Sequence, residues 1–252
     1  MIESYELLKK RLVELANKSY NSDIFTFTQF LGLAEQSAFS EVLPALRGIK
    51  YRAFGGAEGA ERVMIRFGDP DYLGYEVPYP IVTVKIEPTS QKFADKLTHR
   101  DFLGALLNLG IERETLGDIV IRDNVGYLFA KEDIAPYIID SLSRVKHTDV
   151  KLSYAEELPS GELYRTEPCQ VQVSSERLDA VIAKVLSLSR DDAQSLFAKH
   201  LVFVNGKCTE SASYTPKVSD VISVRGHGRM IYRGLSSLSR KGKLNVIVDK
   251  YV

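Results

Sequence analysis

The sequence lacks the features that mark a membrane protein, a secreted disulfide-bonded protein or a zinc protein. It contains no run of roughly 18 apolar residues, the length that a transmembrane helix needs. The segment MIESYELLKKRL is amphipathic and does not have the pattern of a signal peptide. The only cysteines, Cys169 and Cys208, form neither a disulfide framework nor a zinc knuckle. We therefore expect a protein of the reducing cytoplasm that does not insert into membranes.

Complete enzyme motifs are also missing. The glycines of GGAEG, residues 55–59, do not follow the G-x-G-x-x-G spacing of a nucleotide-binding loop, and no long βαβ unit surrounds them. HRD at residues 99–101 resembles the catalytic loop of a kinase, but no Gly-rich loop, strand lysine or Asp-Phe-Gly accompanies it. His147, His200 and His227 have no partners at the spacing of metal ligands. We expect no enzyme, no catalytic residue, no metal site and no cofactor.

The net charge of zero conceals an asymmetry within the chain. Residues 168–252 contain 13 basic and 7 acidic residues, a net charge of +6, whereas residues 1–167 contain 20 basic and 26 acidic residues, a net charge of −6. Such asymmetry indicates that the basic part meets a polyanion, and chance segregation of charge is the alternative.

Residues 1–75 predict an N-terminal, mainly helical α/β cap. At 252 residues, the chain is long enough for two or three small domains. Apolar residues recur at helical spacing over residues 2–15, and a second helix is expected near residues 28–46. The stretch YRAFGGAEGAERVMIRFG, residues 51–68, predicts a strand, a glycine turn, a short helix and a strand.

Residues 76–165 predict a ferredoxin-like domain, whose elements fall between about residues 77 and 155. IVTVKIE alternates as a strand, HRDFLGALLNLG has helical periodicity, and GDIVI and VGYLFA are strands joined by a short turn. KEDIAPYIIDSLSRV then predicts a helix and VKLSYAEEL a strand. The resulting βαββαβ order places two helices on one face of an antiparallel sheet, and the same fold serves as an RNA-recognition (RRM-like) domain.

Three residues of this domain are candidates for secondary RNA contacts. Tyr127 and Phe129 share one face of their strand, and aromatic side chains on an open sheet face can stack on bases. The sequence does not show which face the helices cover, so both aromatics fit equally well in a core. Arg100, near the start of the first helix, is the third candidate.

The segment SSERLDAVIAKVLSLSRDDAQSLFAKHLVFVNG, residues 174–206, predicts helix, turn, helix and hairpin. An apolar stripe from Leu178 to Leu186 marks the buried face of the first helix, and Ser189 is a good N-cap for the second. Val202 and Val204 alternate as in a strand with one buried face and lead to Asn205-Gly206, a strong hairpin-turn signal.

This segment, together with SDVISVRGHGR at residues 219–229, resembles the S4-type RNA-binding domain, with Ser219-Asp220 where the family usually has Gly-Asp. The resemblance implies an S4-type domain over residues 168–252, in which the helix pair and the hairpin present a basic face to structured RNA. The residues that it implicates are Arg177, Arg190, Lys199, Lys207 and Arg225. Lys184 lies off the apolar stripe seven residues after Arg177, so we expect it on the same side.

A basic tail follows the hairpin. The glycines of RGHGRMIYRG, residues 225–234, predict a flexible loop that can approach a phosphate backbone closely. Charge at this density supplies affinity through counterion release, whereas shape complementarity must supply specificity for folded RNA. A solvated charged tail is the alternative. The further candidates for phosphate contacts are Arg229, Arg233, Arg240, Lys241 and Lys243.

Three stretches extend the resemblance to nearly the whole chain. FGGAEGAERVMIRFG, HRDFLGALLNLGIERETLGDIVI and GLSSLSRKGKLNVIVDKY resemble the YlmH family of bacterial cytoplasmic proteins. FLGLAEQ, residues 30–36, departs from the Asp-Pro-Arg-Glu-Gln form usual in that family. The family is similar in role to small ribosome-associated S4-type proteins that bind the large subunit and transfer RNA during rescue of stalled ribosomes.

The sequence therefore predicts an α+β, monomeric, non-catalytic RNA-binding protein of the ribosome. The resemblance implies ribosomal RNA and tRNA of the large subunit as partners, and rescue or quality control of stalled translation as the role. One alternative is an RNA-modifying enzyme that uses the S4-type domain for targeting. RLD at residues 177–179 also occurs in pseudouridine synthases, although Ala180-Val181 replaces their usual continuation. A second alternative is a cell-division-associated interaction factor that binds cell-division proteins, since genes of the family often lie beside cell-division genes.

Overall fold

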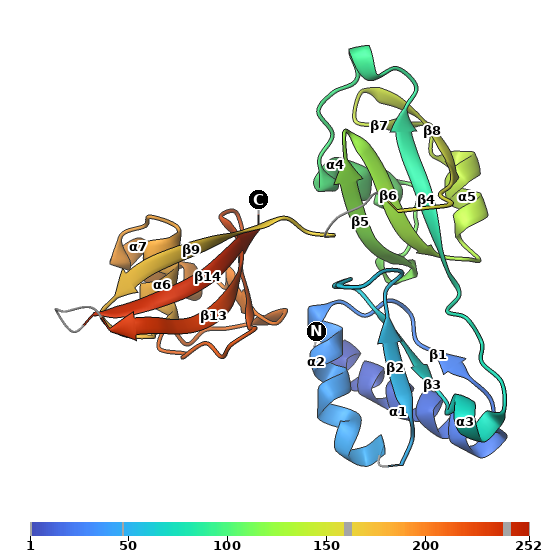
Figure 1. The fold of residues 1–252 in the computed structure, drawn as a ribbon, viewed down its shortest axis with the longest axis horizontal. Helices are drawn as coiled ribbons and strands as arrows, with labels where there is room; N and C mark the ends of the chain where they lie inside the picture. Colours follow the sequence, from blue (N-terminus) through green and yellow to red (C-terminus); the bar gives the residue numbers. More distant parts are fainter. Residues whose placement is uncertain (1, 47, 159–162, 239–242, 252) are drawn as a thin grey trace. The chain divides into compact units, whose positions relative to one another are not determined.

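The computed structural model describes residues 2–46, 48–158, 163–238 and 243–251. The chain divides into two compact units, Met1–Leu163 and Tyr164–Val252 (Figure 1). Both units combine helices with antiparallel sheets, so the predicted α+β class is confirmed.

Two longer helices and a three-stranded antiparallel sheet form the N-terminal part of the first unit. Leu12 and Ala16, one helical turn apart, are fully buried and cluster with Phe39, Ile65 and Phe67. The strand order is β1-β3-β2. The elements are α1 (Ile2–Ser22), β1 (Thr26–Phe27), α2 (Leu33–Val42), a 3-10 helix (Leu43–Leu46), β2 (Tyr51–Phe54), β3 (Met64–Phe67) and α3 (Pro70–Leu73).

The sequence prediction for this part was wrong in two places. The second helix begins at Leu33, not near residue 28, because the chain after β1 still runs along β3: Thr28 N donates to Ile65 O at 3.0 Å, and Leu31 forms an antiparallel bridge with Val63. The segment between β2 and β3 forms a loop and no short helix. A Cβ atom on Gly56, whose φ is 103°, would lie 2.4 Å from the ring of Phe129. The glycine is therefore required because the loop packs against the central sheet.

The central part of the first unit is a five-stranded antiparallel sheet with two helices. The strand order is β5-β6-β4-β8-β7, and the longer elements follow one another along the chain as β4-α4-β5-β6-α5-β8. The elements are β4 (Ile81–Pro88), a 3-10 helix (Gln91–Phe93), α4 (His99–Asn108), a 3-10 helix (Arg113–Thr115), β5 (Leu116–Arg122), β6 (Val125–Lys131), α5 (Ala135–Ser141), β7 (Arg144–Val145) and β8 (Thr148–Tyr154).

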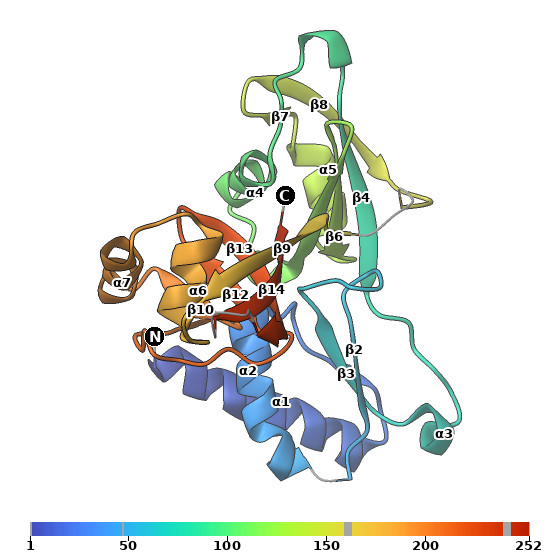
Figure 2. The ribbon, with the colours of Figure 1, turned by 60° about the vertical axis from the view of Figure 1, so that its left-hand side comes forward.

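Both faces of the central sheet carry buried residues. Helices α4 and α5 (Figure 2) bury one face, where Phe102 and Ile138 cluster with Val84 and Leu128 of the strands. On the other face, Phe129 has no exposed surface and clusters with Phe30 and Met64 from the N-terminal part, as well as Val120.

Polar contacts also join the N-terminal part to the central sheet. The Arg62 guanidinium donates to three carbonyl oxygens, from Nε to Leu116 at 2.8 Å and from Nη2 to Phe30 at 3.0 Å and Arg113 at 3.2 Å. The buried Oδ2 atom of Asp118 accepts from the backbone N–H groups of Glu61 and Arg62, at 2.6 Å and 3.2 Å. These charge-assisted bonds fix the loop before β3 against β5.

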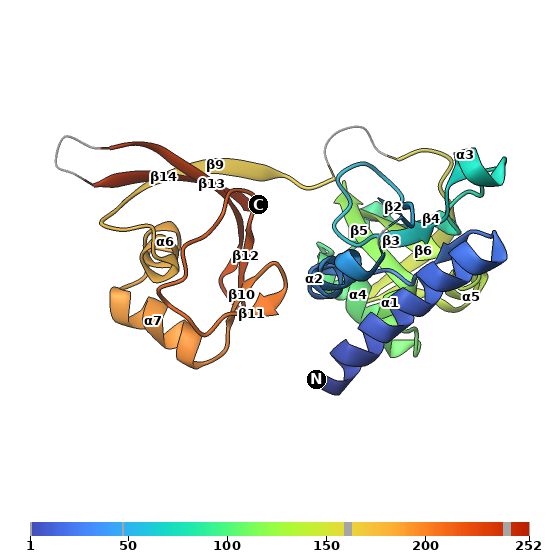
Figure 3. The same cartoon turned by 90° about the horizontal axis from the view of Figure 1, so that it is seen from below.

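The second unit is a six-stranded antiparallel sheet with two helices on one face (Figure 3). Its strand order is β11-β10-β12-β13-β14-β9. The core lies between helices and sheet, where Ile182 and Phe197 cluster with Ile222, Tyr232 and Val248. The elements are β9 (Thr166–Val173), α6 (Leu178–Val185), α7 (Arg190–Ala198), β10 (Val202–Val204), β11 (Lys207–Cys208), β12 (Val221–Val224), β13 (Gly228–Leu238) and β14 (Leu244–Tyr251).

The prediction of a flexible basic loop after β12 was wrong. Residues 228–238 form β13, which pairs with β12 on one side and β14 on the other. Alternating Met230 and Tyr232 are buried, as are Val246 and Val248 of β14. The register shifts between Tyr232 and Gly234, whose φ is 103°, so a glycine marks an irregularity inside the strand. Within the described residues, no helix combines the length and apolar character that crossing a membrane requires.

Candidate nucleic-acid interface

The α6–α7 pair is held in place by caps at both helix starts. The first two N–H groups of α6 are satisfied from the loop before β12: Leu178 N donates to Tyr214 O at 2.8 Å, and Asp179 N to Ala212 O at 3.1 Å. At the start of α7, Ser189 Oγ accepts from Asp192 N at 3.1 Å. Since these groups would otherwise lack partners, the caps give the pair a defined position on the sheet.

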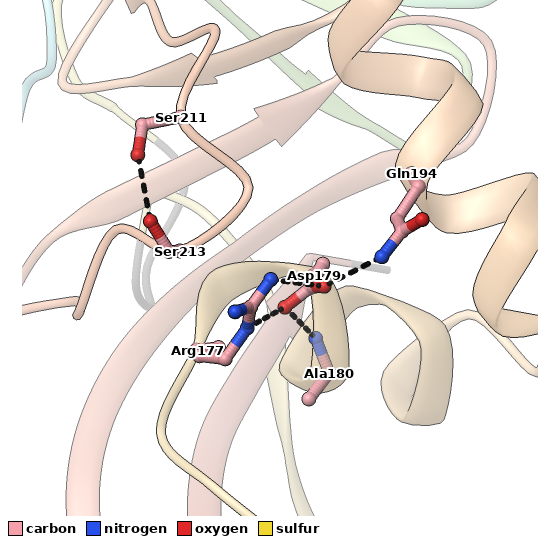
Figure 4. Close-up of polar contacts among 6 residues, drawn as sticks. All are labelled: Arg177, Asp179, Ala180, Gln194, Ser211 and Ser213. Atoms are coloured by element: carbon pink, nitrogen blue, oxygen red, sulfur yellow. Dashed lines mark hydrogen bonds and ion pairs between the residues drawn. The ribbon is translucent and has the colours of Figure 1, made fainter.

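An ion pair between the partly exposed Arg177 and the buried Asp179 lies at the start of α6 (Figure 4). Arg177 donates from Nε to Asp179 Oδ1 at 3.0 Å and from Nη2 to Asp179 Oδ2 at 2.9 Å. The side chain of Asp179 is fully buried, whereas 38% of the Arg177 side chain is exposed. Asp179 also accepts from Ala180 N at 2.9 Å and from Gln194 Nε2 on α7 at 3.4 Å. The carboxylate thus ties the two helices together.

The protonation state of this pair follows from its hydrogen bonds. Burial would raise the pKa of Asp179, but hydrogen bonds from Arg177 and Gln194 outweigh it and lower the pKa below its usual range. The hydrogen bond to Asp179 raises the pKa of Arg177. Asp179 therefore stays charged and has no surface with which to contact a nucleotide. Arg177 combines this structural role with a partly exposed guanidinium.

The other cations expected on the helix pair and the hairpin are all exposed. Arg225 lies with its guanidinium 4.4 Å from the ring centroid of Phe203, a cation–π contact that orients it. Asn205 and Gly206, with φ of 48° and 77°, turn the chain between β10 and β11. The exposed residues are Lys184 on α6, Arg190 at the start of α7, Lys199 after its end, Lys207 on β11 and Arg225 after β12.

The basic residues that the sequence analysis assigned to a flexible tail differ in their surroundings. Arg229 lies 4.9 Å from the ring centroid of Tyr251, and Arg233 Nε donates to Asp249 Oδ2 at 2.6 Å, so both side chains are held along the β13–β14 ladder. Lys243 is exposed just before β14. Arg240 and Lys241 lie outside the described residues.

Asp220 is a second buried carboxylate, and it joins the hairpin to the loop before β12. Its Oδ1 atom accepts from Asn205 Nδ2, and its Oδ2 atom accepts from Tyr214 OH and Lys217 N, each at 2.8 Å. Burial, followed by the hydrogen bond to Asp220, raises the pKa of Tyr214 to about 12, so this hydroxyl remains a donor. The neighbouring Ser219 has a φ of 74°, a left-handed conformation that glycine adopts more readily than serine.

The three candidates in the central part of the first unit differ in how exposed their side chains are. Phe129 is fully buried, so it cannot stack on a base, and its assignment as a secondary contact is corrected by this burial. Tyr127 is half-buried beside Phe129, and Arg100 is exposed on α4. Both stay predictions. Within the described parts of the chain, no three His, Cys, Asp or Glu side chains gather as a metal site would require.

Comparison with known proteins assigns the chain to a family. Residues 76–158 match the family described as "Putative RNA-binding domain in YlmH". Over 232 residues, the chain is 31% identical to the "Ribosome-associated protein quality control protein P2" of Bacillus subtilis (strain 168), a match that covers 88% of this chain and 86% of that protein. The chain belongs to the YlmH family.

A solved structure is also similar to this YlmH-family chain. It is the "Cell division protein ylmH from Streptococcus pneumoniae", with a TM-score of 0.47 and 24% identity, and the match covers 62% of this chain and 92% of that one. The name of the Bacillus subtilis protein describes quality control at the ribosome and includes no enzymatic reaction.

Sequence reasoning singled out the cations of this YlmH-family protein but missed what holds them. Asp179 was noticed only within a motif shared with enzymes, and Asp220 only as part of a turn. A signal for both was present, because each is an acid beside apolar core positions at the edge of a helix or strand. A charged residue in such a place must be paired if it is buried.

Proposed function

We propose that this YlmH-family protein binds RNA without catalysing a reaction, and that it acts on the large ribosomal subunit in rescue or quality control of stalled translation. Ribosomal RNA and tRNA are its proposed partners. Support comes from the match of residues 76–158 to an RNA-binding family and from the name of the Bacillus subtilis relative. The proposed organisation is a cap (1–75), an RRM-like domain (76–165) and an S4-type domain (168–252).

One observation carries the proposal: five exposed cations stand on a helix pair and a hairpin that two buried carboxylates hold in place. The Asp179 and Asp220 carboxylates fix the α6–α7 pair and the hairpin from inside. A rigid basic surface suits folded RNA, since phosphates provide the attraction and the fixed spacing of the cations provides shape recognition. The five cations are Lys184, Arg190, Lys199, Lys207 and Arg225.

The RNA-modifying alternative depends on an accessible acid, and the two acids in enzyme-like motifs are both engaged. Asp179 is fully buried and holds Arg177. Asp101 caps its own helix, where its Oδ2 atom accepts from Thr98 N at 2.8 Å and Thr98 Oγ1 at 2.7 Å. The hydrogen bonds from Thr98 lower the pKa of Asp101. Both geometries serve folding, so they support a non-catalytic role.

Deletion of the gene should therefore leave the modifications of ribosomal RNA and tRNA unchanged. Mass spectrometry of nucleosides from wild-type and deletion cells measures this directly. The contrary result is the loss of one defined modification that wild-type protein restores and an Asp101→Asn or Asp179→Asn protein does not. Because Asp179→Asn also alters a buried ion pair, its folding must be verified by circular dichroism.

A further inference from the structure

The central part of the first unit carries a basic hollow on its helix side, which we call the α4–β7 groove. It is a cavity of about 490 Å³ lined by α4, the end of α5 and the segment through β7. The residues that matter for its chemistry are Arg100, Asp101, Gly104, Arg144 and Lys146, all within the range that matches the RNA-binding family.

The cations of this groove are available to an outside anion. Among the residues that the structure describes, no carboxylate pairs with Arg100 or Lys146. Arg144 Nε contacts Asp149 Oδ1 at 2.8 Å, but both side chains are more than 60% exposed (63% and 61%). Such surface pairs are weak, so Arg144 can exchange its partner for a phosphate. Asp101 is the one described acid in the lining. It accepts hydrogen bonds from Thr98, and the positive charge of Lys146 also lowers its pKa, so it is the anion that a phosphate must compete with for Lys146.

Gly104 gives an independent reason to expect a ligand. It lies inside α4, where glycine is less favourable than alanine. A Cβ atom there would meet nothing within 4 Å, and its φ is not in the left-handed region. Neither packing nor backbone geometry therefore calls for glycine. The residue does leave the helix backbone bare on the wall of the groove, where a bulky polymer can approach closely.

Lys146 is a second locally unfavourable choice on the same groove. It occupies the turn between β7 and β8 with a φ of 56°. Glycine or asparagine adopts this conformation more readily than lysine does. Residues that depart from local preference concentrate at functional positions. Gly104 and Lys146 are two such residues, and both line the same cavity as Arg100.

The opposite face of the sheet is less suited to phosphate. Phe129 is buried there, and two lysines of that face, Lys85 and Lys151, share one acid. Glu87 contacts Lys85 at 3.0 Å and Lys151 at 3.4 Å. These hydrogen bonds lower the pKa of Glu87 and raise that of Lys85, so both stay charged.

From these observations we infer that the α4–β7 groove binds the phosphate backbone of RNA, with Arg100, Arg144 and Lys146 as its ligands to the phosphates and Gly104 as the point of close approach. The RNA-binding domain of this chain thus uses its helix side, not the sheet face. The inference rests on the proposed function in one respect, namely that the protein binds RNA.

A pair of substitutions at Gly104 tests the groove with a matched control. Gly104→Gln and Gly104→Glu have nearly the same shape, fit open space and improve helix propensity, so both proteins should fold. In the full chain, Gly104→Glu should bind bulk tRNA at least about fivefold more weakly than Gly104→Gln, because the added carboxylate repels phosphate. Equal affinities would overturn the inference.

A second variant removes the two available cations. In Arg100→Gln/Lys146→Asn, asparagine suits the left-handed turn, so the melting temperature should not fall. Each phosphate contact contributes roughly 0.7 to 0.9 to the slope of log K against log salt, so the slope should decrease by about 1.4 to 1.8. Lys10→Gln/Lys18→Gln, which removes equal charge from exposed positions of α1, should leave the slope unchanged.

The outcomes separate this inference from the proposed function. Suppose that Gly104→Glu binds tRNA as tightly as Gly104→Gln, and that Arg100→Gln/Lys146→Asn has the same salt slope as Lys10→Gln/Lys18→Gln. If alanine at Lys184, Arg190 and Lys199 still weakens tRNA binding, the groove assignment is wrong and the proposed function stands. If wild-type protein does not bind tRNA or ribosomal RNA at all, both fail. If Gly104→Glu keeps full RNA affinity but loses association with ribosomes, the groove contacts a protein, which also overturns the RNA assignment.

Discussion

Replacing Asp220 with alanine should destabilise the second unit by about 3 to 5 kcal/mol, since several buried donors lose their acceptor at once. Asn205 Nδ2, Tyr214 OH and Lys217 N all donate to this carboxylate. Asn205 in turn accepts from Val221 N at 2.9 Å, so the defect extends to β12. Urea unfolding combined with amide hydrogen exchange of β10 and β12 measures the loss and assigns it to this unit.

Asp191→Ala is the matched control for this substitution. Asp191 is an exposed acid in the first turn of α7, where its removal affects only the helix dipole and should cost about 0.5 kcal/mol. Asp220→Asn should fall between the two, because it retains one acceptor oxygen. A loss for Asp220→Ala no larger than for Asp191→Ala would show that the carboxylate does not hold the hairpin.

Alanine at Lys184, Arg190 and Lys199 together should greatly weaken binding to ribosomal RNA and tRNA without unfolding the protein. All three side chains are exposed, and alanine favours helix at Lys184 and Arg190. Three lost phosphate contacts should lower the slope of log K against log salt by about two to three units. With equal affinity at 1 M salt, this corresponds to roughly a hundredfold to thousandfold weaker binding at 0.1 M salt. A salt titration of the equilibrium constant provides both quantities.

The charge-matched control is Lys10→Ala/Arg11→Ala/Lys18→Ala. These residues are exposed on α1, so the variant has the same net charge and the same number of substitutions. It should retain the wild-type slope. If the two triple variants behaved alike, the attraction would come from overall charge, and the α6–α7 surface would have no special role.

Local signals account for the parts of the fold that the sequence predicted well. The α6–α7 pair has a continuous apolar stripe and a serine N-cap, and the following hairpin has alternating valines before Asn205-Gly206. The information needed for these elements lies within a few residues. The exposure of the five cations could be read from the same periodicity.

Tertiary contacts account for what the sequence did not reveal. The face of Phe129 is covered by Phe30 and Met64, which lie far away in the chain, so no local pattern could show that it is core. Alternation in β13 is interrupted at Gly234, and this irregularity made a long strand resemble a loop. The buried partners of Arg177 and Asn205 likewise become visible only once the chain has folded.

RNA crosslinking in living cells, mapped at nucleotide resolution, tests the central claim most directly. The wild-type protein should crosslink to large-subunit ribosomal RNA and to tRNA, and the variant with alanine at Lys184, Arg190 and Lys199 should lose most of these contacts at equal abundance. Crosslinks no stronger than background would contradict the account, as would crosslinks confined to a single nucleotide whose modification disappears when the gene is deleted.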